Sequence, residues 1–158
     1  MGQESDAHEI GTEFAGQLLF WLWRASHART AAALETVGLT PPLFAILNVI
    51  GAREGCIQGE LAATLGIDPS TMVSLIDQLE GAGLAHRRPS PSDRRAREVA
   101  ISASGRRRLD AARRLAARVE DDVLAGLTAA ERRRLLALLR RALAAIPPQP
   151  PWTGAEDG

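Results

Sequence analysis

Proline and glycine divide the middle of the chain into short helices separated by tight turns. Thr40-Pro41-Pro42 and Asp68-Pro69 each place an N-cap residue before proline, which is typical of a helix start. Gly51, Gly66 and Gly81 follow apolar residues at helical spacing and indicate where those helices end. The pattern predicts helices over about 41–51, 58–65 and 69–80, with only a few residues between the last two.

Two short extended segments follow, at about 84–88 and 97–101. A polar tip that contains Pro89, Pro91 and Asp93 joins them, and its length predicts a β-hairpin with a long loop. Two short helices joined by a tight turn and followed by a hairpin form a winged helix-turn-helix. A further extended piece, Gly55-Cys56-Ile57, lies before the first of these two helices.

Long helical stretches flank this region. Residues 5–36 are apolar on two faces at helical spacing, and such a helix usually packs against two partners. Ser102 can cap a helix to about residue 127, and Thr128 with Glu131 forms a capping box for a last helix to about residue 146. The fold class predicted is mainly α with a small β-hairpin wing.

Four segments follow from this division. We expect an N-terminal helix in 1–37, the winged helix-turn-helix in 38–102 and C-terminal helices in 103–146. Residues 147–158 are rich in proline, glycine and acids, and are expected to form a disordered tail.

The net charge is zero, with 19 basic and 19 acidic residues, and every basic residue is arginine. The charges are segregated along the chain. Residues 1–80 hold three arginines and ten acids, whereas residues 81–118 hold eleven arginines and three acids. A basic block of this kind is either a local footprint for a polyanion or a solvated arginine-rich face.

Several classes of protein are disfavoured by the same composition. A single cysteine allows no internal disulfide, and Cys56 is expected to be a small buried residue rather than a redox sensor. No apolar run reaches the length of a membrane span, and the polar N-terminus does not read as a secretory signal, so we expect a cytoplasmic protein. The three histidines lack metal-ligand spacing and no phosphate-binding loop is present, so neither an enzyme nor a cofactor is expected.

Between residues 39 and 110 the chain carries a series of specific motifs. They are Leu39-Thr40-Pro41-Pro42, Gly59-Glu60-Leu61-Ala62, Leu65-Gly66-Ile67, Ser70-Thr71-Met72-Val73, Ile76-Asp77-Gln78-Leu79-Glu80, Gly83-Leu84, Arg87-Arg88-Pro89, the D-x-R pair Asp93 and Arg95, and the run from Val99 to Gly105. These motifs resemble those of the MarR (multiple-antibiotic-resistance regulator) family. The resemblance implies an obligate homodimer. The N-terminal dimerisation helix in 1–37 and the C-terminal dimerisation helices in 103–146 would join the subunits, and each subunit would present one winged helix to double-stranded DNA. It also implies a repressor released by a small aromatic or anionic effector, or by an oxidant.

The helix from Pro69 would be the recognition helix, with its N-terminal residues in the major groove. Ser70, Thr71 and Ser74 are short donors that can reach phosphates or base edges, and the helix N-terminus itself favours phosphate. The alternative for Ser70 is that it only completes the helix start. Many relatives carry arginine where Ser74 stands, so direct base reading by this helix is expected to differ from theirs.

Arginines dominate the predicted wing. By resemblance, Arg95 would enter the minor groove beside Arg94, and Asp93 would hold a wing arginine in place or form the turn. Arg87, Arg88 and Arg97 on the two strands would contact phosphates. The rival interpretation is a winged helix that binds an acidic protein surface without specific DNA binding; the D-x-R wing favours DNA.

The flanking helices suggest two further functions. The apolar residues of the last two helices exceed what the small winged region can cover, which favours a dimer over an intramolecular bundle. Phe20, Trp23, Arg24 and His27, closed by Phe44, could line a ligand cleft. For Phe20 and Trp23, packing in the core is the favoured alternative.

Overall fold

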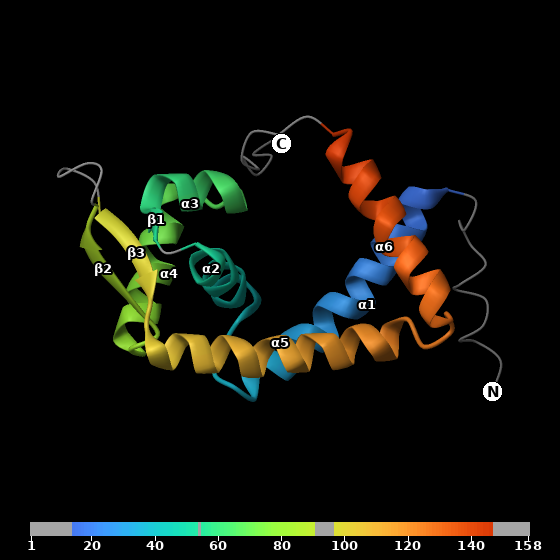
Figure 1. Ribbon diagram of the computed structural model, residues 1–158, viewed down its shortest axis with the longest axis horizontal. Helices are drawn as coiled ribbons and strands as arrows, with labels where there is room; N and C mark the ends of the chain where they lie inside the picture. Colours follow the sequence, from blue (N-terminus) through green and yellow to red (C-terminus); the bar gives the residue numbers. More distant parts are fainter. Residues whose placement is uncertain (1–13, 54, 91–96, 147–158) are drawn as a thin grey trace, which may run out of the picture.

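The computed structural model describes residues 14–53, 55–90 and 97–146. In these residues the chain forms α1 (Ala15–Glu35), α2 (Pro41–Ala52), β1 (Cys56–Ile57), α3 (Gln58–Leu65), α4 (Pro69–Gly81), β2 (Ala85–Pro89), β3 (Arg97–Ile101), α5 (Ala103–Val123) and α6 (Ala129–Ala144). Figure 1 shows α2, α3, α4 and the strands gathered at one end, α1 and α6 crossing at the other, and α5 running between them. The predicted fold class is confirmed.

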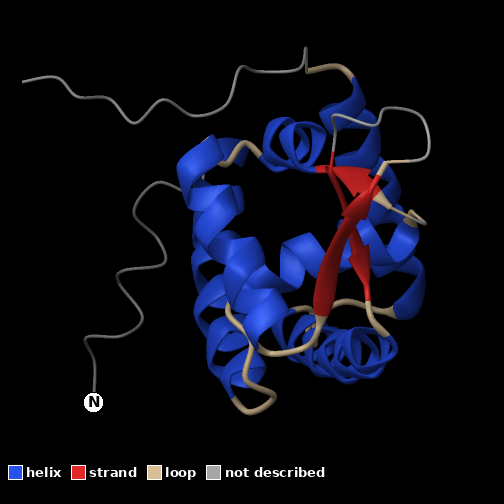
Figure 2. Cartoon of the chain, turned by 90° about the vertical axis from the view of Figure 1, so that its left-hand side faces the viewer, coloured by secondary structure: helices blue, strands red, loops and turns tan. Residues whose placement is uncertain are grey.

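The sheet has three strands in the order β1-β3-β2, one more than the expected hairpin. Both neighbours of β3 are antiparallel to it, and Val99 lies opposite Cys56 on one side and Arg87 on the other. Figure 2 shows the strands side by side against the helices. A two-residue strand shows no alternation of its own, so the sequence indicated only that Cys56 and Ile57 are extended.

One apolar core joins α2, α3, α4 and the sheet to the ends of α1 and α5. Cys56 is buried in this core, as expected, and Phe44 packs partly buried against it. The largest fully buried side chains are Leu34, Leu39, Ile46, Leu47, Ile50, Leu61, Met72, Ile76, Leu79 and Val99. The elements from α2 to β3, which we call the winged module, are therefore held as one unit with the start of α5.

Local signals account for most helix ends. Gly38 has a φ of +66° at the end of α1, where Leu39 N donates to Leu34 O at 3.1 Å. Thr128 and Glu131 form the predicted capping box at the start of α6. Thr40 occupies the N-cap of α2 but makes no side-chain cap hydrogen bond, so the two prolines that follow carry that start.

The long helices leave large apolar side chains exposed. Phe20 and Trp23 on α1 are 50% and 58% exposed, so neither packs in the core of the described protomer. Packing in a core shared by two subunits stays a prediction for both. α6 has no buried residue, and Leu138, Leu143 and Ile146 are exposed on or just beyond it. Nothing in the described part of the chain covers these side chains.

The predicted tail 147–158 and the first part of the predicted first helix lie outside the described residues. None of the helices in the described ranges is long and apolar enough to cross a lipid bilayer. In the same ranges, no group of three or more His, Cys, Asp or Glu residues is placed to hold a metal ion.

Candidate nucleic-acid interface and ligand cavities

Helix α4 presents a polar face to solvent. Met72 and Ile76 on its other face are fully buried in the core, which fixes the rotation of the helix. Ser70, Thr71 and Ser74 are all exposed, as the predicted recognition helix requires. The structure therefore brings these three candidate residues together near one end of α4.

The carboxylate of Asp68 accepts hydrogen bonds from two donors at the start of α4. Its Oδ1 accepts from Ser70 Oγ at 2.6 Å and from the Thr71 amide at 2.9 Å. The Met72 amide donates to the Asp68 carbonyl oxygen at 2.9 Å, and Pro69 has no amide proton. The hydrogen bonds from Ser70 and Thr71, that from Ser70 first, hold the pKa of Asp68 well below its usual range.

This cap changes what the helix start can offer to DNA. A Ser70 hydroxyl that donates its proton to Asp68 presents lone pairs outward, and the ionised carboxylate is itself an acceptor. Acceptors match the amino groups of cytosine and adenine in the major groove. They do not match phosphate oxygens. Of the two contacts expected for Ser70, with a phosphate or with a base edge, this hydrogen bond therefore favours the base edge.

Arg87 lies among acidic side chains rather than facing outward. Its Nη1 is 2.6 Å from Asp77 Oδ1 and forms a second ion pair with Glu80. Its Nε donates to Gln58 Oε1 at 3.4 Å. We expected Arg87 to contact phosphate, but its guanidinium is already paired with two carboxylates.

Arg88 and Arg97 lie on neighbouring strands near the wing end of the sheet. Arg88 pairs with Glu98 at 3.2 Å and keeps 43% of its side chain exposed. Ser90 is buried and donates to the other oxygen of Glu98 at 3.1 Å. Arg97 is exposed. Asp93, Arg94 and Arg95, which carry the predicted minor-groove contact, lie outside the described residues.

The acidic partners of the arginines were missed from the sequence. Asp77, Glu80 and Glu98 were not among the candidate residues, because an acid on a helix face or on a strand is ordinarily exposed. The available signal was the distance along the chain: Glu80 is seven residues before Arg87, across the turn that returns the chain from α4 to β2. Only the packed geometry decides which charges meet.

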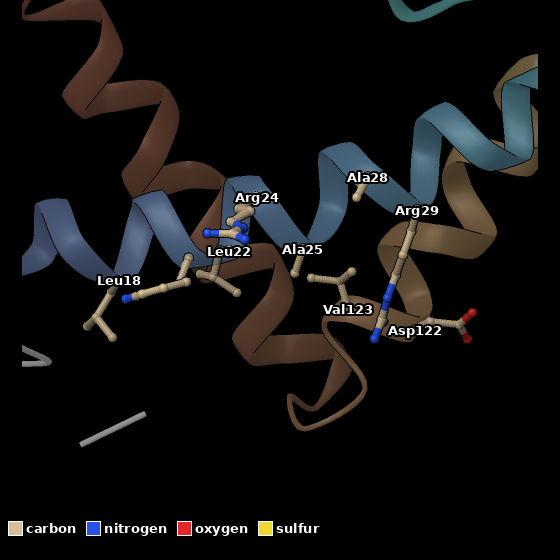
Figure 3. A pocket seen from close by; sticks show the side chains of 9 residues that line it. Leu18, Leu22, Arg24, Ala25, Ala28, Arg29, Asp122 and Val123 are labelled. Carbon is tan, nitrogen blue, oxygen red and sulfur yellow. The ribbon is translucent and has the colours of Figure 1, made fainter. Parts of the chain in front are cut away.

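Two cavities flank α1. Figure 3 shows the first, of about 740 Å³, with Leu22, Ala25 and Val123 facing the space between α1 and the end of α5. In the same view the Arg29 side chain extends from α1 toward Asp122. The second cavity, of about 490 Å³, lies between α1, α5 and α6 and is lined by Trp23, His27, Glu120 and several leucines.

The five expected ligand residues do not line one common cavity. Trp23 and His27 line the second cavity with their rings stacked 5.0 Å apart. Arg24 lines the first, over the ring of Trp21 at 5.6 Å. Phe20 and Phe44 are among the lining residues of neither cavity. The two faces of α1 therefore serve two different cavities.

Comparisons with known proteins agree with this geometry. A family model described as MarR family matches residues 37–96. A candidate transcriptional regulator of the hcr operon of Thauera aromatica is 36% identical over 141 residues, which are 85% of this chain and 84% of that protein.

Two solved structures are similar over most of the chain. The transcriptional repressor CouR bound to a 23-mer DNA duplex has a TM-score of 0.74 and 35% identity, over 83% of this chain and 93% of that one. CouR from Rhodococcus jostii RHA1 bound to p-coumaroyl-CoA has a TM-score of 0.74 and 28% identity. The similarity covers 87% of this chain and 96% of that one.

Proposed function

As this chain belongs to the MarR family, we propose that it is a transcriptional repressor that binds a pseudo-palindromic operator as a homodimer. The observation that carries this proposal is the winged module itself. It presents the polar face of α4 beside strands that carry Arg88 and Arg97. The comparison with a repressor bound to a DNA duplex supports this use of the fold.

The exposed apolar faces of α1 and α6 argue for the dimer. A second copy would cover the leucines and aromatic residues that the protomer leaves in contact with water. A two-fold dimer presents two α4 helices to successive half-sites, about one helical turn of DNA apart. In this arrangement residues 1–37 and 103–146 form the dimerisation region, and residues 38–102 bind DNA.

Each part of the winged module has a separate role in this proposal. Ser70, Thr71 and Ser74 face base edges in the major groove, with Asp68 accepting hydrogen bonds from the Ser70 hydroxyl and the Thr71 amide. Arg88 and Arg97 contact phosphates, which positions the module without reading sequence. Arg95 enters the minor groove from the wing that also carries Arg94, with Asp93 holding a wing arginine in place.

The effector we propose is an aromatic acyl-CoA thioester, the class bound by one CouR structure. The apolar cavities beside α1 would take the aromatic part, with Trp23 and His27 in one of them. The protein acts in this way as a regulator in the cytoplasm and not as an enzyme.

Electrophoretic mobility shift with the protein's own upstream DNA, in excess nonspecific competitor, tests the central proposal. A discrete complex that survives competitor, and a footprint with two half-sites, would support it. If the protein binds no specific DNA fragment, the proposal is contradicted. A winged helix that binds an acidic protein surface is then the favoured alternative.

A further inference from the structure

One side chain joins three elements of the winged module. Arg87 on β2 contacts Asp77 and Glu80 on α4 and Gln58 at the start of α3. We propose that Arg87 is a positioning residue that holds the wing strands in a fixed register on the recognition helix, and that it does not contact phosphate. This inference rests on the proposed function, because it concerns how the two DNA-contacting parts are held relative to each other.

The link involves the main chain as well as the side chain. The Arg87 amide donates to Glu80 Oε1 at 2.6 Å, while the guanidinium pairs with Glu80 Oε2. Glu80 therefore binds β2 at two points. Because Arg87 lies opposite Val99, the strand held in this way is also the strand that pairs with β3 and Arg97.

Charge and burial keep the Arg87 guanidinium where it is. The side chain is only 19% exposed, and burial alone would lower its pKa. Hydrogen bonds and charge interactions with Asp77 and Glu80 outweigh that effect and raise the pKa of Arg87 above its usual value. Moving the guanidinium to a phosphate would leave both carboxylates uncompensated beside a polyanion.

The link reaches the face of α4 that meets DNA. Ser70, Ser74 and Asp77 follow one another at i, i+4 and i+7, so they share one face of the helix. Asp77 is exposed at that face, and Arg87 neutralises it. The same guanidinium thus connects the base-reading face of α4 to the strands that carry Arg88 and Arg97.

Arginine and lysine differ in what they can do at this position. A lysine ammonium is a point charge that serves well as a phosphate ligand. It cannot reproduce a planar guanidinium that bridges two carboxylates and an amide oxygen. Arg87→Lys therefore keeps the charge and removes the bridge, which separates a positioning role from a phosphate contact.

The test measures operator affinity of the full-length protein by fluorescence anisotropy over a salt series. It compares Arg87→Lys and Arg87→Ala with Arg97→Ala as the matched phosphate-binding control. We expect both Arg87 variants to weaken binding, by roughly three- to thirtyfold. For Arg87→Lys the slope of log affinity on log salt should be that of wild type. Arg97→Ala should reduce the slope by about 1 for each phosphate that is no longer neutralised.

Two results would overturn the inference. If Arg87→Lys binds like wild type while Arg87→Ala reduces the salt slope as Arg97→Ala does, Arg87 contacts phosphate. If thermal denaturation shows that the Arg87 variants are less stable, yet the folded protein binds the operator with unchanged affinity, the residue only stabilises the fold. Failure of wild type to bind specific DNA would instead contradict the proposed function, so the two failures are distinguishable.

Discussion

The carbonyl oxygen of Leu84, just before β2, lies directly against Gly105 in the first turn of α5. The same oxygen accepts a hydrogen bond from the Ser102 amide at 3.0 Å. A Cβ built on Gly105 would overlap this backbone oxygen, which cannot move aside as a flexible side chain could. This close contact fixes the position of the winged module relative to the start of α5.

Gly105→Ala is expected to destabilise the protein by about 1–3 kcal/mol, because the added methyl group overpacks this junction. Urea denaturation followed by circular dichroism measures the change. Gly59→Ala is the matched control: a Cβ at Gly59 meets nothing within 4 Å in helix α3, so alanine there should be neutral or stabilising. Equal stability of Gly105→Ala and wild type would contradict the packing described here.

Leu138→Glu should separate the proposed dimer. Leu138 is an exposed apolar residue on α6, and a carboxylate at the centre of an apolar interface would lose its hydration. We expect sedimentation velocity at micromolar concentration to show a monomer, with operator affinity reduced at least about tenfold. Ala130→Glu adds the same charge in the first turn of α6 and should leave the dimer intact. A monomeric wild type would exclude the proposed assembly.

Asp68 should stabilise the protein in a pH-dependent way. Its pKa is lowered in the folded state, so its contribution is present above the unfolded pKa, about 3.9, and is lost as the pH falls through the folded pKa. Asp68→Ala should lower the Tm at pH 7 by roughly 2–4 °C, through loss of the α4 cap. Asp68→Asn retains a cap and does not titrate. A Tm advantage of wild type over Asp68→Asn that stays constant between pH 5 and pH 2 would be inconsistent with this assignment.

Arg95→Ala should weaken operator binding substantially while the dimer persists. The expectation comes from the D-x-R pattern of the wing, where a guanidinium would enter the narrow, negative minor groove. Anisotropy at physiological salt measures the affinity, and sedimentation checks the assembly. Unchanged affinity for the operator would show that the minor-groove assignment of the wing is wrong.

The effector proposal predicts a change in tryptophan fluorescence. Trp21 and Trp23 line the two cavities beside α1, so a ligand in either should alter their emission. Titration with p-coumaroyl-CoA should change the fluorescence, and the same ligand should release the operator in a mobility shift. Free coenzyme A serves as the control for the nucleotide part alone. No response to a broad panel of aromatic acids and their thioesters would count against an effector at these cavities.

Local signals predicted much of the fold. Gly38, Asp68 and Thr128 specify helix ends through backbone conformation or a side-chain cap within a few residues, which a sequence displays directly. The apolar spacing in α4 also predicted its buried face, including Met72 and Ile76. These features need no knowledge of distant residues.

Features that depend on distant contacts were not predictable in the same way. The third strand exists because Cys56 meets Val99, more than forty residues away. The engagement of Arg87 depends on how β2 returns along α4, and the exposure of Trp23 depends on a face that the protomer does not cover. The residue types indicated which side chains are candidates for the functional site. Which residues they contact depends on the three-dimensional packing.

Helix α5 also has a mechanical consequence. Its 21 residues form one uninterrupted helix of about 31 Å, with the winged module at its start and the α1 cavities near its end. If a bound molecule tilted this rod by about 5° about its far end, the near end would move by about 2.7 Å. That displacement approaches the 3.4 Å spacing of successive nucleotides, so in the proposed DNA complex a small change in angle at one end would misalign α4 with the bases.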